Sequence, residues 1–341
     1  SLARGIRTKQ YTSEEVVRAY LQRIEQVNAR INAVVQVPAE AALAEARAKD
    51  AALARGEATG PLHGVPFTAK DVFDTAGVVT AVGLQERADF VPERDATVVA
   101  RMRAAGAILL GKTNCPPGGG GGASDNPVYG RTKNPYNLAH SPGGSSGGEA
   151  AIITAGGSPV GLGSDSGGSL RLPAHFCGIT CLKPTSGRVP NTGGYDHPGG
   201  LSDPRTQVGP MARRVEDLGL VLSIIAGVDW RDAGVVPMPL QDPAAVDITA
   251  LRLAYYPDDG SATPTPETRQ AVVGVARALQ SAGVTVEEAR PEALQRSREI
   301  TERHWRLPDL TGMEVEQLHS DWDRFRTEML GFMQEYDLIL S

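Results

Sequence analysis

Helical and strand-like patterns alternate along most of this chain, and this alternation restricts the fold more than any other feature. The residues after the capping-box pattern Thr12–Glu15 predict a helix, and Pro38 opens a second, alanine-rich helix that Gly56 can close. The further elements are predicted in this order: strand 65–68, helix 95–106, strand 107–110, helix 149–155, strand 160–162, helix 215–226, strand 251–256, helix 266–282 and strand 284–287. We therefore expect an α/β fold, with helices on both faces of a parallel or mixed sheet.

The composition is that of a soluble enzyme. The 341 residues are enough for about one to two domains, and 41% hydrophobic with 22% charged residues is an ordinary balance. A net charge of −6 gives no general attraction to nucleic acid or to an anionic membrane. No window approaches the ~18 consecutive apolar residues of a membrane span, and the first residues lack the apolar core of a signal peptide. We expect a cytoplasmic enzyme.

The three cysteines imply neither a disulfide framework nor a metal site. Cys177 and Cys181 lie four residues apart with no second ligand pair, so we interpret them as small buried apolar residues and expect no metal.

The segment from about 111 to 209 holds most of the glycines, many of them in pairs or runs. Glycine is favoured where the backbone bends unusually or approaches a ligand closely. Apolar residues such as Ile152, Leu162 and Leu170 are interleaved throughout, so the segment must be packed and cannot be a flexible linker. A packed, glycine-dense segment at the centre of an α/β chain is where we expect the chemistry.

Two short patterns match known motifs without their structural context. Residues 106–113 fit the phosphate-loop expression G-x-x-x-x-G-K-[ST], but the four intervening residues are themselves the predicted strand and prolines follow. Residues 143–147 fit the G-x-S-x-G nucleophile elbow, but no apolar strand precedes them and the histidines stand in no triad arrangement. We expect neither nucleotide binding nor a Ser-His-Asp triad.

Three further segments, in the right order, resemble the amidase signature family, which includes fatty acid amide hydrolase and bacterial amidases. They are His63–Asp71, Ser141–Glu149 with the two alanines that follow, and Gly161–Gly178, closed by Leu182–Arg188. The resemblance is dense from Leu62 to Asp232, weaker over the N-terminal helices and thin beyond Asp242.

The resemblance implies one domain over residues 1–341 with a three-layer α/β/α architecture and a large mixed, mostly parallel sheet. It divides the chain into N-terminal helices at 1–60, a signature core at 62–232 and a variable C-terminal part at 243–341. The last six residues, 336–341, read as a buried strand. Because a core strand is an unusual place for a chain to end, the sequence leaves a continuation beyond Ser341 open.

The resemblance places the family's catalytic lysine at Lys70, its bridging serine at Ser145 and its nucleophile at Ser169. A serine hydroxyl must lose its proton as it attacks, and a lysine accepts that proton only if burial keeps it neutral. The apolar residues before Lys70 suit such burial, whereas Asp71 and Asp74 would oppose it. Family members hold the bridging serine through a cis peptide bond, here between Gly144 and Ser145.

The loop around Ser169 is expected to form the oxyanion hole through the backbone N–H groups of Ser166, Gly167, Gly168 and Ser169. Asp165 and Arg171 are expected to brace the loop, and Thr185 could only support it. The five consecutive glycines 118–122 depart from the family, which usually has larger residues there. They suggest a wide or mobile pocket, with Gly119 and Gly120 nearest the substrate.

The resemblance implies an amidase that hydrolyses a small-molecule amide through an acyl-serine intermediate, without metal or organic cofactor. We expect no nucleic acid and no membrane span, and leave a homodimer open. One alternative is the amide-cleaving component of a glutamine-dependent amidotransferase acting on tRNA. Residues 147–149 and 195–197 look more like stand-alone amidases. The other alternative is a non-catalytic binding protein, against which Lys70, Ser145 and Ser169 argue.

Overall fold

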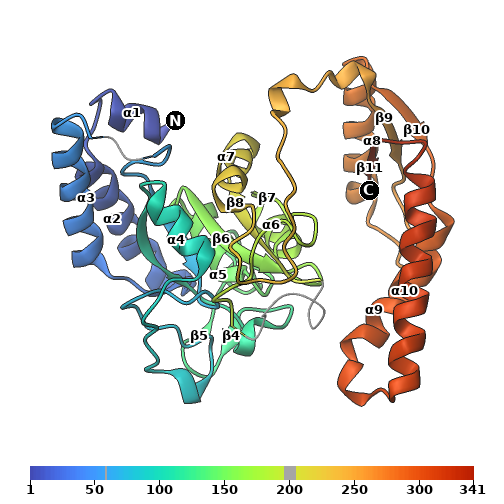
Figure 1. The fold of residues 1–341 in the computed structure, drawn as a ribbon, viewed down its shortest axis with the longest axis horizontal. Helices are drawn as coiled ribbons and strands as arrows, with labels where there is room; N and C mark the ends of the chain where they lie inside the picture. The colour runs from blue at the N-terminus through green and yellow to red at the C-terminus, as the bar shows by residue number, and fades with distance from the viewer. Residues whose placement is uncertain (58–59, 196–204) are drawn as a thin grey trace. The chain divides into compact units, whose positions relative to one another are not determined.

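The computed structural model describes residues 1–57, 60–195 and 205–341 (Figure 1). The chain forms two compact units, Ser1–Leu240 and Gln241–Ser341, where the sequence predicts one domain with a variable part from residue 243. The predicted site residues all belong to the first unit.

The first unit is built on a six-stranded mixed sheet in the order β1-β3-β2-β6-β8-β7. The three central strands β3, β2 and β6 are parallel, whereas β1, β8 and β7 pair antiparallel. Their bounds are Val34–Gln36 (β1), Pro66–Lys70 (β2), Ile108–Thr113 (β3), Val160–Asp165 (β6), Thr180–Cys181 (β7) and Gln207–Ala212 (β8). The predicted α/β class with a mixed sheet is confirmed. The strand patterns anticipated β2, β3 and β6 and missed the other three.

Helices cover both faces of this sheet, and alternate side chains of β2 turn to opposite faces (Figure 1). Phe67 and Ala69 join the core with α1 (Leu2–Arg7), α4 (Thr97–Ala104) and α7 (Val215–Ile225). The opposite face packs against α2 (Ser13–Ile31), α3 (Ala39–Ala54), α5 (Gly147–Thr154) and α6 (Arg171–Cys177). This second face carries Thr68 and Lys70. A two-stranded ribbon, β4 (Asp125–Asn126) with β5 (Gly130–Arg131), lies outside the main sheet.

The helix start signals were only partly correct. Thr12 and Glu15 form the predicted capping box of α2. Asp95, predicted to cap the next helix, does not, since Ala96 is the N-cap of α4. The Asp95 carboxylate instead accepts a hydrogen bond from Ala76 N at 2.8 Å and lies 3.5 Å from Arg103 Nε.

Glycines on β6 let the helices of the second face approach the sheet closely. A Cβ on Gly161 would overlap the Glu149 carboxyl group, and a Cβ on Gly163 would lie 2.6 Å from Leu170 Cδ2 and 2.8 Å from Ser146 Oγ. Because only glycine leaves this room, α5 and the loop before α6 can lie against the strand. This close packing brings the serine-bearing segments to the sheet.

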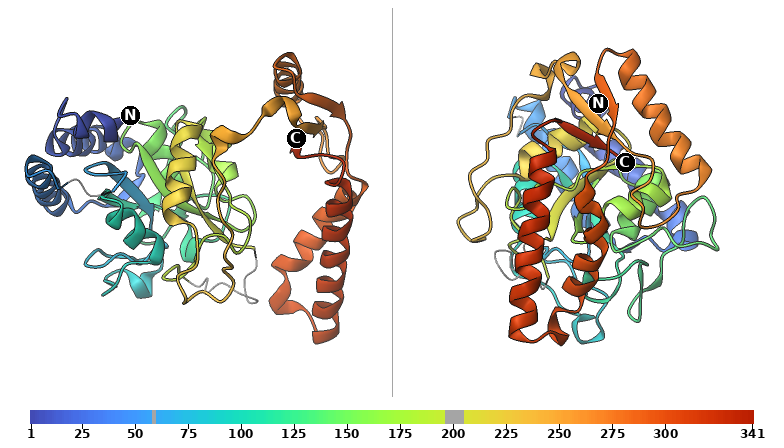
Figure 2. Two further views of the ribbon diagram at one scale, coloured as in Figure 1. Left: turned by 45° about the horizontal axis from the view of Figure 1, so that its top comes forward. Right: turned by 90° about the vertical axis from the view of Figure 1, so that its right-hand side faces the viewer.

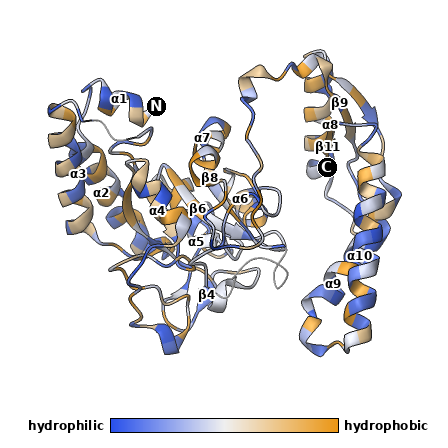
Figure 3. Cartoon of the chain, viewed as in Figure 1, coloured by the Kyte–Doolittle hydropathy of each residue, from blue (hydrophilic) through white to orange (hydrophobic). Residues whose placement is uncertain are grey.

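The second unit has a three-stranded parallel sheet in the order β10-β9-β11, with β9 (Arg252–Tyr255) in the middle. β10 is Thr285–Glu288 and β11 is Leu338–Leu340, and the helices are α8 (Pro266–Ser281), α9 (Ser297–Trp305) and α10 (Gly312–Phe332). α9 and α10 lie side by side (Figure 2). α10 mixes hydrophilic and hydrophobic residues along its length (Figure 3), and Leu318 is its buried residue.

A buried ion pair fixes the end of β2. Lys112 Nζ lies 3.2 Å from Asp71 Oδ1 and also donates to Phe73 O and Thr80 Oγ1, both at 2.8 Å. Asp71 Oδ2 accepts from Val82 N at 2.8 Å. Lys112 is thus the lysine of the phosphate-loop-like pattern, and in the structure it points into the protein from the middle of β3.

Removing one partner of this pair should strongly destabilise the first unit. Lys112→Met leaves the Asp71 carboxylate buried and unpaired, a change that costs about 3–5 kcal/mol in comparable proteins. Urea unfolding should show this loss, and Asp71→Asn combined with Lys112→Met should recover part of it. A loss below about 1 kcal/mol for Lys112→Met would contradict the importance given to the pair.

Candidate active site

Lys70 lies at the carboxyl end of β2 and is completely buried. Its Nζ atom contacts two hydroxyls, Ser145 Oγ at 2.6 Å and Ser164 Oγ at 2.9 Å, and lies 3.5 Å from Gly119 O. The sequence thus predicted correctly that Lys70 and Ser145 meet, across 75 residues of chain.

Burial lowers the pKa of Lys70 to about 8, because the low-dielectric surroundings disfavour the ammonium form, and the more distant Cys115 and Asp165 oppose this only in part. Asp71 does not raise the Lys70 pKa as the sequence suggested, because its carboxylate is paired with Lys112. A substantial fraction of Lys70 is therefore neutral in mildly alkaline solution, as a proton acceptor requires.

The turn that carries Ser145 is held by its backbone. The peptide bond between Gly144 and Ser145 is cis, as the resemblance implied. Ser124 Oγ lies 3.3 Å from Ser145 O and accepts a hydrogen bond from Gly147 N at 3.0 Å. The neighbouring hydroxyl of Ser146 turns to the backbone of Ser164, which supports the assignment of Ser145 as the lysine's partner.

Ser169 lies beside this turn, since its carbonyl oxygen accepts a hydrogen bond from Ser146 N at 3.1 Å. Its side chain is half-buried, whereas Ser145 is buried. Among the residues that the structure describes, no hydrogen bond joins the hydroxyls of Ser169 and Ser145. The two serines are brought together through their backbones, and the role of Ser169 as nucleophile stays a prediction.

Asp165 braces the loop before Ser169, as expected. Its carboxylate accepts from Gly168 N at 2.7 Å and Leu170 N at 3.0 Å, and Arg171 binds it through Nε at 3.0 Å and a terminal nitrogen at 2.9 Å. Burial would raise the pKa of Asp165, but these donors outweigh burial and lower it to about 2.

This brace changes the predicted oxyanion hole. The Gly168 N–H already donates to Asp165, so in this structure it is not available to an oxyanion. The N–H groups of Ser166, Gly167 and Ser169 remain as predicted donors.

The glycine run 118–122 lies between the lysine and the cis bond. Gly119 is buried, and a Cβ there would lie 2.6 Å from Val72 Cγ1 and 3.9 Å from Lys70 Nζ. A Cβ on Gly144 would lie 2.6 Å from Gly121 O, so the run also packs against the Ser145 turn. Gly120 is exposed and meets nothing within 4 Å. The structure therefore brings Gly119 to the predicted site and leaves Gly120 at its surface.

Two polar residues of the site were not predicted in these roles. Ser164 is the second hydroxyl on Lys70, and it lies near the end of β6, the parallel neighbour of β2. Glu149, in the first turn of α5, is buried against Thr68 and Thr113. Parallel pairing of the two predicted strands would have indicated Ser164, because their carboxyl ends meet at the same edge.

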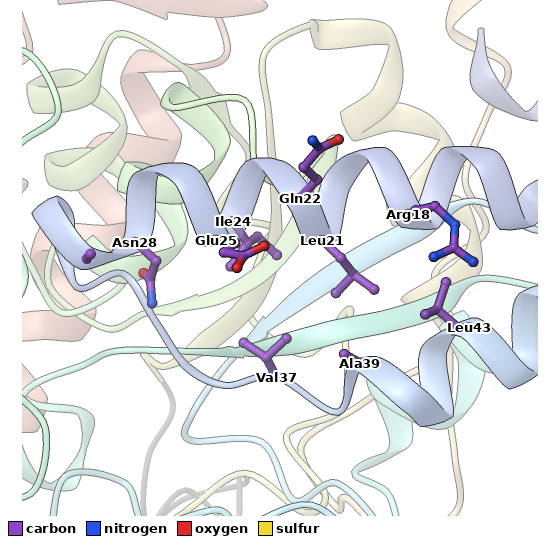
Figure 4. Close-up of a pocket in the computed structure, with 10 residues that line it drawn as sticks. Arg18, Leu21, Gln22, Ile24, Glu25, Asn28, Val37, Ala39 and Leu43 are labelled. Carbon is purple, nitrogen blue, oxygen red and sulfur yellow. The ribbon is translucent and has the colours of Figure 1, made fainter.

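The described residues give no sign of other chemistry. They contain no cluster of three or more His, Cys, Asp or Glu residues that could hold a metal, and none of their helices has the length and apolar character to cross a membrane. A pocket of about 710 Å³ beside α2 and α3 contains none of the predicted site residues (Figure 4). Asp196 and His197, part of the 195–197 segment weighed above, lie outside the described residues.

Comparison with known proteins decides the family. A family model described as Amidase matches residues 15–307. The chain belongs to the amidase family. It is 45% identical over 255 residues to the amidase-family subunit of the glutamyl-tRNA(Gln) amidotransferase of Methylococcus capsulatus, covering 74% of this chain and 52% of that protein. The chain thus spans about half the length of this relative.

Solved structures show the same fold. The structure of 6-aminohexanoate cyclic dimer hydrolase complexed with substrate has a TM-score of 0.84 at 30% identity, covering 99% of this chain and 78% of that one. Fatty acid amide hydrolase has a TM-score of 0.85 at 26% identity, covering 99% and 68%. The amidase signature fold and the resemblance drawn from the sequence are confirmed.

The predicted partners were wrong. The sequence pointed to a small-molecule amide without nucleic acid and left a homodimer open. The similar curated relatives, such as those of Methylococcus capsulatus and Roseiflexus sp., are instead named as one subunit of an amidotransferase for glutamyl-tRNA(Gln). A net charge of −6 excludes general attraction to nucleic acid but says nothing about binding through other proteins of such an enzyme.

Neutralising Asp165 should weaken the loop. Asp165→Asn removes the charge that Arg171 and two backbone N–H groups bind, and a hydrogen bond to a charged group contributes about 1.5–3 kcal/mol. Because the folded-state pKa is depressed, this stability is present above the ordinary Asp pKa and is lost as pH falls towards about 2. Denaturant unfolding should therefore show a deficit at pH 7 that shrinks in acid. A deficit that does not change with pH would contradict the assignment.

Proposed function

We propose that this protein is the amide-cleaving component of a glutamine-dependent amidotransferase acting on glutamyl-tRNA(Gln). Ser169 acts as nucleophile, Ser145 as proton relay and Lys70 as base. Two findings support the proposal: the buried contact of 2.6 Å between Lys70 Nζ and Ser145 Oγ, and the 45% identity to a relative named as part of such an amidotransferase.

In the proposed reaction, Ser169 Oγ attacks the side-chain amide carbon of glutamine. Its proton passes to Ser145 Oγ, whose own proton passes to neutral Lys70. The tetrahedral oxyanion accepts hydrogen bonds from the N–H groups of Ser166, Gly167 and Ser169.

Collapse of the intermediate breaks the C–N bond, and Lys70 returns its proton through Ser145 to the leaving nitrogen. Ammonia departs, and water hydrolyses the acyl-serine by the same relay to give glutamate. The ammonia is then the nitrogen donor for the carboxyl group on the tRNA.

A stand-alone amidase is the second candidate. It is favoured by the likeness over 99% of this chain to 6-aminohexanoate cyclic dimer hydrolase, a structure whose name describes an enzyme acting on an amide without tRNA. The absence of side chains along residues 118–122 also leaves room for an acyl group larger than that of glutamine.

A nitrogen-tracing assay separates the two candidates. Glutamine labelled with ¹⁵N in its side-chain amide is supplied with glutamyl-tRNA(Gln) and the remaining amidotransferase subunits. The proposal predicts that the label reaches the tRNA-bound amino acid only when this protein is present. Rapid cleavage of simple aliphatic or aryl amides, with no transfer from glutamine, would contradict it and favour the stand-alone amidase.

The catalytic residues should separate clearly by mutation. Ser169→Ala and Lys70→Ala should each lower kcat by at least about a thousandfold, since the members of a nucleophile–base unit act together. Circular dichroism should show an intact fold for Ser169→Ala. Ser145→Ala should cost far more activity than Ser146→Ala, because only Ser145 contacts the lysine. An active Ser169→Ala protein would exclude this mechanism.

The rate should increase towards alkaline pH. Lys70 must be neutral to accept a proton and its pKa is lowered to about 8, so kcat/KM should rise with pH and level off above that value. Initial rates between pH 6 and about 10 measure this directly. A profile that falls above neutrality would show that a different group acts as base.

A further inference from the structure

The Glu149 carboxyl group is enclosed at the junction of α5 with the sheet. It has no solvent exposure, and its two oxygens contact the hydroxyls of Thr68 on β2 and Thr113 on β3. Gly161 of β6 lies against the same carboxyl group and leaves the space it occupies. Three central strands thus surround one acidic side chain of the helix that follows Ser145.

The hydrogen bonds around this carboxyl group can be checked proton by proton. Oxygen atoms form a chain from Glu149 Oε1 to Thr68 Oγ1, then to Ser158 Oγ at 2.9 Å, and then to the backbone oxygen of Val160 at 2.9 Å. Three oxygen–oxygen contacts need three protons. Thr68 and Ser158 supply one each, and the Val160 carbonyl supplies none.

The third proton must come from the carboxyl group. If Ser158 donates to Val160 and Thr68 donates to Ser158, the contact between Thr68 and Glu149 holds only when Glu149 carries a proton and donates it. The other carboxyl oxygen, Oε2, then accepts from the Thr113 hydroxyl at 2.7 Å. Every group in the cluster is satisfied by a neutral acid and not by a carboxylate.

We propose that Glu149 is a neutral carboxylic acid that positions Ser145 against Lys70. The catalytic meaning of this positioning rests on the proposed function, whereas the protonation state does not. Thr68 lies two residues before Lys70 on the same face of β2, and Thr113 is the β3 residue paired with Lys70. Glu149 lies four residues after Ser145. One carboxylic acid therefore ties the serine turn to both strands around the lysine.

The electrostatic surroundings agree with this assignment. Burial raises the pKa of Glu149 to about 8, and the two threonine hydroxyls reduce that effect only partly. The titratable side chains on the surrounding strands are Lys70, Lys112 and Asp165. Lys112 is paired with Asp71, and Asp165 with Arg171. The charged residues of α2 and α6, which pack beside α5, are exposed or half-buried.

Glu149→Gln is the sharpest variant. Its amide can donate to Thr68 and accept from Thr113, which reproduces the bonding of the neutral acid. Above the ordinary Glu pKa the unfolded wild-type chain holds this group ionised while the folded chain keeps it protonated. Folding then takes up one proton, so wild-type stability falls as pH rises towards about 8.

The stability advantage of Glu149→Gln over wild type in urea unfolding should therefore grow between pH 5 and about 8, the window set by the raised pKa. Glu14→Gln is the matched control, because Arg18 lowers the pKa of this surface carboxyl and any change should have the opposite sign. A difference between wild type and Glu149→Gln that is constant over this pH range overturns the proposal.

Ser158→Ala tests the proton chain itself. Without the Ser158 oxygen, Thr68 can donate its proton to Glu149, so the carboxyl group no longer has to be protonated. In the Ser158→Ala background, the growth with pH of the Glu149→Gln advantage should shrink. An unchanged growth would overturn the assigned hydrogen-bond directions. Infrared difference spectra of wild type against Glu149→Gln should also show the carbonyl band of a protonated carboxyl at pH 6, and its absence overturns the neutral acid.

Activity tests the positioning role. Glu149→Gln should keep kcat within about threefold of wild type, whereas Glu149→Leu, which cannot bond either threonine, should lower kcat at least tenfold with little change in KM. Loss of activity in both variants overturns the positioning role. If Ser169→Ala stays active while the pH-dependent stability difference is found, the proposed function fails and the neutral Glu149 stands.

Discussion

The buried contact between Lys70 and two serine hydroxyls is the interaction on which the rest of the site depends. Removing an amino group from water disfavours its charged form, so burial at the end of β2 turns a strongly basic side chain into one that is partly neutral near pH 8. Ser145 and Ser164 then give the nitrogen hydrogen-bond partners without adding charge. The ion pair of Lys112 with Asp71 keeps the adjacent carboxylate from reversing this effect.

The same principle of keeping charge away from the lysine explains the neutral Glu149. A carboxylate among Thr68, Thr113 and Gly161 would lack donors, whereas a carboxylic acid completes the hydrogen bonds of three elements. Glycines on β6 permit this arrangement because they leave room for the carboxyl group and for the serine turn. The packing of the second helical layer and the chemistry of the site are therefore one problem, solved by small residues on β6.

The sequence predicted the fold class and the contact between Lys70 and Ser145, because long periodic segments and ordered motifs are visible in one dimension. It missed β8, where Pro210 argues against a central strand, although its carbonyl pairs with Leu182 N. It missed Ser164 because strand adjacency is a property of topology, not of spacing. It offered Gly168 N–H to an oxyanion because the Asp165 side chain that binds it could not be placed.

The central claim is that Ser169, and not Ser145, is the nucleophile activated through Lys70. Labelling with a serine-reactive fluorophosphonate, followed by peptide mass spectrometry, tests it most directly. The label should appear on Ser169 in the wild-type protein, at a rate that increases with pH through about 8, and it should be lost in Lys70→Met. A label on Ser145, or one that forms equally well without Lys70, would contradict the claim.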